Sequence, residues 1–163
     1  MNWAHIHLVV NHVPVLGTIF GLLLFGYAVV RRDEGLKRIG LAAFAIVALL
    51  ALPVFFTGEP AEGVVKGTAG ISEPVVEAHE GAALFALIAV ELLGAVALAG
   101  LLVTRRGRRP LPAAFARATV LVSVIAAGLM ARTANLGGKI HHTEIGAGAV
   151  APTEGEAEHD AGR

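Results

Sequence analysis

Four long apolar runs, separated by short polar segments, dominate the pattern of this 163-residue chain. They cover residues 9–30, 36–56, 81–103 and 113–134. A helix needs about 20 residues to cross the hydrocarbon core of a bilayer, and each run is long enough to do so. The runs lack the polar face that a soluble amphipathic helix shows every 3.6 residues, most clearly at FAIVALLALPVFF, residues 44–56. The pattern predicts an all-α integral membrane four-helix bundle.

Composition supports a membrane protein and sets one domain apart from a tail. Apolar residues make up 55% of the chain and charged residues only 16%, against about 25% charged residues in a soluble domain. From residue 146 onward the sequence GAGAVAPTEGEAEHDAGR is small and acidic, and it has too few apolar side chains to order itself. We therefore predict a transmembrane domain at residues 1–145 and a disordered C-terminal tail at 146–163.

The basic residues predict how the bundle is oriented. Two loops, at residues 31–38 and 105–117, hold nine of the 13 lysines and arginines. The segment between the second and third runs has one base, Lys66, against five glutamates. Because short loops rich in Lys and Arg stay in the cytoplasm, we expect both basic loops inside and both chain termini on the outer, periplasmic side.

The segment between the second and third runs carries turn and capping signals. Pro53, followed by Thr-Gly-Glu-Pro at residues 57–60, predicts a kink and then a turn. Ser72 is a good N-cap residue, with Glu73 and Pro74 in the first turn after it. The third helix is therefore expected to start before the membrane does and to project from its outer face.

The histidines gather on the predicted outer side. None of the seven lies in a basic loop, whereas the other loops and the termini each hold at least one. Imidazole is the commonest metal ligand in proteins and titrates near neutral pH. A cofactor or proton-handling site is therefore expected at the outer face. The seven histidines are His5, His7, His12, His79, His141, His142 and His159.

Three of these histidines come from different helix ends and are the candidate ligands. His12 lies at the mouth of the first helix with Asn11 as a plausible cap, His79 lies on the projecting turn of the third helix, and His142 follows the fourth. Histidines that converge from different helices are how bundles build cofactor sites. The alternative is structural: His12 as an interfacial residue bonded to a neighbouring loop, and His79 as part of a solvated turn.

Two charges lie deeper in the apolar runs. Glu91 is about 15 Å below the apolar edge, where a charge costs about 2.5–3.5 kcal/mol. We expect Glu91 to be neutral or paired with Arg132, which could instead bind a haem propionate or reach the headgroups. Glu80 and Glu91 are eleven residues apart and share a helix face, so they form a possible proton relay. A neutral Glu91 bonded to a neighbouring helix is the plainer alternative.

The absence of cysteine restricts the chemistry. It excludes disulfides, thiolate metal sites, iron–sulphur clusters and covalently attached c-type haem within this chain. We also find no nucleophile–base pair, no nucleotide-binding loop and no feature that indicates a nucleic-acid partner. An electron-transfer component is therefore expected rather than an enzyme that acts alone.

Four motifs carry a family resemblance. The segments NHVP at 11–14, FTGEPAE at 56–62, SEPVVEAHEGAA at 72–83 and ANLGGKIHHTEI at 134–145 resemble a family of small, uncharacterised bacterial four-helix membrane proteins. The resemblance covers about residues 1–145 and implies a multi-pass protein of the bacterial inner membrane. Similar domains fused to Rieske iron–sulphur modules hint at electron transfer. The family pattern has Arg where His141 stands, which makes His142 the better ligand candidate.

These observations leave three hypotheses. The first is a b-type haem protein with axial ligands among His12, His79 and His142 and with Arg132 near the propionates; it would exchange electrons with quinone and with a redox partner protein or a larger respiratory or photosynthetic complex. The second is a His/Glu site that binds or transports a divalent metal. The third is a non-catalytic accessory subunit of a membrane complex.

Overall fold

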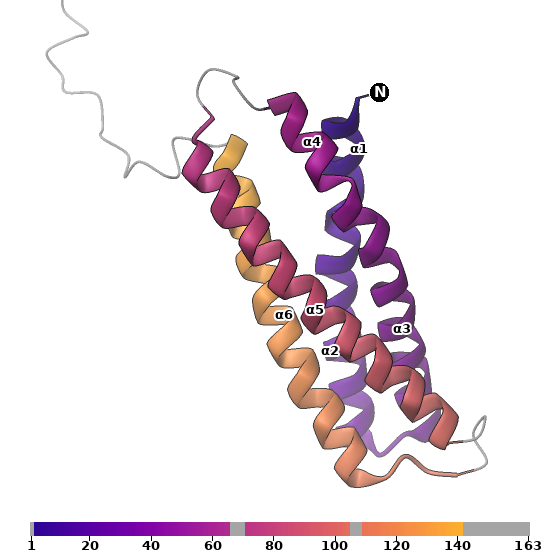
Figure 1. Cartoon of the computed structure of the whole chain (residues 1–163). Helices are drawn as coiled ribbons and strands as arrows, with labels where there is room; N and C mark the ends of the chain where they lie inside the picture. Colours follow the sequence, from indigo (N-terminus) through magenta and orange to yellow (C-terminus); the bar gives the residue numbers. More distant parts are fainter. Residues whose placement is uncertain (1, 66–70, 105–108, 142–163) are drawn as a thin grey trace, which may run out of the picture.

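The computed structural model describes residues 2–65, 71–104 and 109–141, and every regular element in these ranges is an α-helix. The predicted tail and His142 lie outside the described residues. The helices run up and down along one long axis (Figure 1). They are α1 (Trp3–Val10), α2 (His12–Arg31), α3 (Glu34–Phe56), α4 (Gly58–Val65), α5 (Glu73–Val103) and α6 (Ala113–His141).

Four helical segments of 28 to 31 residues are long and apolar enough to cross a membrane, as the hydropathy pattern predicts. Helix α1 with α2 forms the first segment, α3 with α4 the second, and α5 and α6 the other two. Many large apolar side chains point outward: Val30 is 80% exposed, Leu102 76% and Phe56 70%. Apolar surface on this scale is unfavourable in water, so the arrangement indicates a multi-pass membrane protein.

The first segment is interrupted at Asn11, between α1 and α2. Pro14 lacks the N–H that would bond the carbonyl four residues earlier, which explains a local break at this point. Asn11 keeps a helical backbone and makes no side-chain cap bond, so its predicted capping role is wrong. Asn2 caps α1 instead, because its side chain accepts a hydrogen bond from the His5 amide.

The turn predicted after Pro53 is confined to one residue, Thr57, between α3 and α4. Helix α3 continues through Pro53 to Phe56, Thr57 keeps a helical backbone, and α4 begins at Gly58. Pro60 lies in the first turn of α4, where no intrahelical bond from its nitrogen is required. The result is a nearly continuous helix that extends the second span.

The last two helices begin and end close to the predicted positions, with one extension. Ser72 has the extended backbone of an N-cap with Pro74 in the first turn, as predicted, although its side chain makes no cap bond. Helix α6 continues to His141, about two turns beyond the apolar run. The extension brings Gly137 beside α5.

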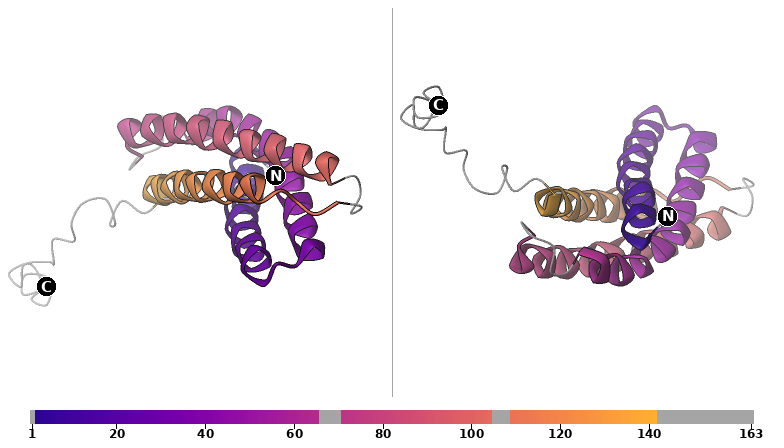
Figure 2. Two further views of the ribbon diagram at one scale, coloured as in Figure 1. Left: turned by 90° about the horizontal axis from the view of Figure 1, so that it is seen from below. Right: turned by 90° about the horizontal axis from the view of Figure 1, so that it is seen from above.

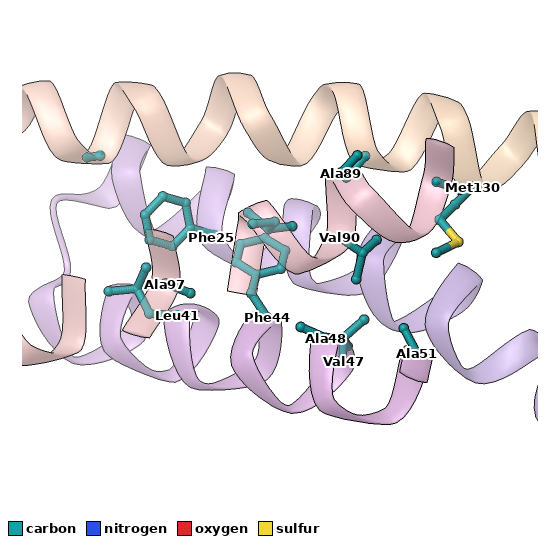
Figure 3. Packing of buried hydrophobic residues seen from close by; sticks show 14 of the residues in the cluster. Phe25, Leu41, Phe44, Val47, Ala48, Ala51, Ala89, Val90, Ala97 and Met130 are labelled. Carbon is teal, nitrogen blue, oxygen red and sulfur yellow. The ribbon is translucent and has the colours of Figure 1, made fainter. Parts of the chain in front are cut away.

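The core lies where α2, α3, α5 and α6 form a closed ring of neighbours, α2 against α3, α3 against α5, α5 against α6 and α6 against α2 (Figure 2). Phe25 and Phe44 fill its centre with ring centroids 6.0 Å apart (Figure 3). Glycines allow the close approach. A Cβ on Gly21 would lie 2.6 Å from the Phe44 ring, and one on Gly94 would overlap the Cβ of Ala48.

One end of the bundle carries the short 31–34 connection and the segment that precedes α6; we call it the basic end. Asp33 caps α3 by accepting a hydrogen bond from the Leu36 amide. Glu34 Oε1 pairs with Lys37 at 2.6 Å, and its Oε2 accepts a hydrogen bond from the Leu111 amide at 2.8 Å. This carboxylate therefore ties the two connections together.

The opposite end, which holds α1, α4, the start of α5 and the end of α6, is the histidine end. Here α1 packs on α4, while α5 packs on α6, and neither α1 nor α4 packs along α5 or α6 within the described residues. The two pairs diverge toward this end (Figure 1). They form two arms, and each arm carries a half-buried histidine, His7 or His79.

Candidate cofactor site at the histidine end

His79 on α5 is held by α6. Its Nδ1 lies 3.0 Å from the main-chain carbonyl oxygen of Thr133. A carbonyl can only accept, so Nδ1 must carry the proton and donate. In the neutral ring the lone pair is then on Nε2, which bonds to no other group of the described residues. A histidine fixed through Nδ1–H with Nε2 left over is the usual state of a metal- or haem-ligating imidazole.

Gly137 makes room for this ring. A Cβ at Gly137 would lie 3.0 Å from Cε1 and 3.3 Å from Nδ1 of His79. The Thr133 hydroxyl does not compete for the ring, because it donates to the carbonyl of Leu129 one turn earlier. One turn of α6 therefore supplies both the acceptor and the space that orient His79.

His7 on α1 has a matching arrangement in the other arm. Its Nδ1 lies 3.0 Å from the hydroxyl oxygen of Thr57. The Thr57 hydroxyl donates its one hydrogen to the Val54 carbonyl oxygen at 2.7 Å, so the hydroxyl oxygen accepts the hydrogen bond from the ring. The neutral ring is again protonated at Nδ1 and carries its lone pair on Nε2.

His7 and His79 interact electrostatically although they belong to different arms. Both side chains are half-buried. The histidine end therefore holds two oriented imidazoles, and neither Nε2 bonds to another group of the described residues.

His12, the ligand candidate chosen from the sequence on this segment, is exposed. Its Nδ1 lies 3.2 Å from the Leu8 carbonyl one turn earlier. At about 100° per residue, His5 and His12 share one outward face of the first segment, whereas His7 lies on the opposite face, against Thr57. The helical period of the sequence therefore places His7 and His12 on different faces. It does not show which face points into the bundle until the position of α4 is known.

The remaining site candidates are spread around the bundle. Arg132 is exposed on α6, next to the residue that holds His79. It forms no ion pair with Glu91 within the described residues, and Glu91 Oε1 is buried without a hydrogen-bond partner. Glu80 is exposed and already engaged with another group.

The predicted relay from Glu80 to Glu91 spans about 16 Å along α5 at 1.5 Å per residue. Leu84 and Leu87 lie between them on that side of the helix, so α5 alone offers no polar side chain to carry a proton across the interval. His142, the third predicted ligand, lies outside the described residues, as does the side chain of His141.

Within the described ranges, no three His, Asp or Glu side chains group closely enough to hold a metal ion. A protein zinc site takes three or four ligands from the chain, so these residues give the divalent-metal hypothesis no support. A haem iron differs, because the porphyrin supplies four nitrogens and the protein only the axial ligands. Two oriented imidazoles fit that requirement.

Comparisons with protein-family models, with curated proteins and with solved structures found no match to this chain. The family resemblance of the four sequence motifs therefore stays a prediction.

Proposed function

We propose that this chain is a membrane-embedded b-type cytochrome-like electron-transfer protein, with a non-covalently bound haem at the histidine end and His79 as one axial ligand. The observation that carries the proposal is the hydrogen bond from His79 Nδ1 to the Thr133 carbonyl. It fixes the ring and leaves Nε2 as the only nitrogen that can bind iron. The same bond raises the basicity of the ring and so strengthens it as a ligand.

Haem bound there would supply a one-electron Fe(III)/Fe(II) couple. The chain's own residues would hold it: His79 Nε2 as ligand, Gly137 as the space beside the ring, and the exposed guanidinium of Arg132 as a partner for a propionate. The chain has no cysteine, so no thioether attachment is possible. Exposed apolar surface along the helices fits the surrounding lipid.

The placement in the cell follows from the charge pattern. Basic loops in the cytoplasm would put the histidine end at the periplasmic face of a bacterial inner membrane. An electron could then pass between quinone in the bilayer and a periplasmic redox protein, or a partner subunit of a larger respiratory or photosynthetic complex. This position suits a carrier or subunit rather than an enzyme that acts alone.

The test is an optical spectrum of the full chain purified in detergent from haem-replete cells, oxidised and then reduced. We expect a Soret band that sharpens and shifts on reduction, and a pyridine haemochrome of the b type. His79→Ala should lose the band, and the matched His5→Ala variant, altered at an exposed position on α1, should keep it. A wild-type protein that neither contains haem nor binds added haem would overturn the proposal.

A further inference from the structure

We infer that the second axial ligand is His7, so that the haem iron is held between Nε2 of His7 and Nε2 of His79 and joins the two arms of the histidine end. This inference rests on the proposed function. It replaces His12, the candidate chosen from the sequence, with a histidine on the opposite face of the same helical segment.

The first reason is orientation. The Thr57 hydroxyl oxygen accepts from Nδ1 of His7, as the Thr133 carbonyl accepts from Nδ1 of His79. Each ring therefore has its proton on the nitrogen that faces its own arm. Each lone pair is on the other nitrogen, and neither Nε2 bonds to another described group.

The second reason is position. His7 and His79 are half-buried and interact electrostatically, whereas His12 is exposed. A haem edge is strongly apolar, so a ligand at a half-buried position allows more of the porphyrin to leave water. His12 faces outward with His5 and would hold the group against the outside of the bundle.

The third reason is the shape of this end. Helix α1 packs on α4, and α5 packs on α6, but the two pairs do not pack along one another at the histidine end. They diverge there (Figure 1). Facing histidines from two helices are a common way for bundles to hold a cofactor. A group ligated by both rings would join the two arms, which do not pack along one another within the described residues.

The inference makes Thr57 a positioning residue. Its hydroxyl accepts from the His7 ring and donates to the Val54 carbonyl. Thr57→Val keeps the shape of the side chain and removes the acceptor, so the His7 ring loses the bond that selects its tautomer. Thr57→Ser retains the hydroxyl and is the matched control.

The experiment titrates haem into the purified full-length wild type and into His7→Ala, His12→Ala and His79→Ala. We expect the wild type and His12→Ala to give low-spin, six-coordinate spectra. His7→Ala should give a five-coordinate, high-spin spectrum with at least tenfold weaker binding. Millimolar imidazole should return His7→Ala to the low-spin form, which also shows that this variant is folded.

A readout without haem tests the same geometry. In the haem-free protein at pH 8, ¹⁵N shifts of selectively labelled histidine should report the Nδ1–H tautomer at His7. That tautomer should be kept in Thr57→Ser and redistributed in Thr57→Val. An Nε2–H tautomer at His7 in the wild type would overturn the inference.

The two proposals fail in different ways. If the wild type binds haem, His79→Ala loses it, and His7→Ala keeps a six-coordinate spectrum, then the function stands and His7 is not the ligand. If His12→Ala becomes five-coordinate instead, the candidate chosen from the sequence is restored. If the wild type binds no haem at all, the proposed function fails and the ligand assignment fails with it.

Discussion

Gly137 on α6 leaves the space that the imidazole of His79 on α5 occupies. A Cβ at Gly137 would lie 3.0 Å from Cε1 of that ring. A Cβ added to the neighbouring Gly138 would have no atom within 4 Å. Two consecutive glycines in one helix therefore differ in what they do, and only the first shapes the candidate site.

This difference gives the first prediction. Gly137→Leu should displace the His79 ring and weaken haem binding about tenfold or more, because overpacking of a tight contact costs about 1–3 kcal/mol. Gly138→Leu should bind haem as the wild type does. Haem titration of both variants makes the measurement. Equal affinity in the two variants would show that the contact between Gly137 and His79 does not shape the site.

The hydropathy pattern was sufficient to predict the four helical segments, because helices that cross lipid must be long and apolar. Helix ends were predictable where a capping residue marked them, as at Ser72. The end of α6 was not, since its last two turns follow the apolar run into polar residues that continue the helix. The turn predicted near residue 57 is limited to Thr57, because that residue retains helical dihedrals and α4 starts directly after it.

The candidate site was predicted in part. His79 could be selected because it lies on a helix that projects beyond the apolar run. His7 could not be separated from His12, since the choice depends on which face of α1 meets α4. The packing of α1 on α4 cannot be predicted from a pattern along the chain. The hydrogen bonds that assign the tautomers join residues 50 and 54 positions apart, which local sequence does not reveal.

The second prediction concerns the basic end. Glu34→Ala removes both the pair with Lys37 and the acceptor for the Leu111 amide, and should lower the free energy of unfolding by about 1–3 kcal/mol. Glu34→Gln should cost less, because its amide oxygen can still accept from Leu111. Thermal unfolding in detergent measures both variants. Glu59→Ala, at an exposed position of the opposite end, is the control and should change little.

The third prediction concerns orientation. The chain has no cysteine, so a single introduced cysteine reports its own side of the membrane. Ser72 is exposed and its side chain makes no cap bond, so Ser72→Cys should leave α5 intact. We expect Ser72→Cys to react with an impermeant maleimide in intact cells and Gly35→Cys to react only after lysis. The reverse result would place the histidine end in the cytoplasm and exclude a periplasmic redox partner.

The last prediction concerns Glu91, whose Oε1 is buried near the middle of α5 and has no hydrogen-bond partner among the described residues. A buried polar atom without a partner costs about 1–3 kcal/mol, and a charge near the middle of a membrane costs at least as much. If the glutamate has no role, Glu91→Leu should raise the free energy of unfolding by about that amount and leave electron transfer unchanged.

If Glu91 moves protons, Glu91→Leu should still stabilise the fold but slow proton-coupled reoxidation of the haem by quinone. Glu91→Gln should slow it equally, because the amide keeps the shape and cannot exchange the proton. Glu77→Gln, an exposed change on the same helix, controls for altered surface charge. Reoxidation followed by stopped-flow absorbance across pH 6–8 makes the measurement. Wild-type rates in both Glu91 variants would rule out the relay. The buried carboxyl would then lower the free energy of unfolding without serving proton transfer.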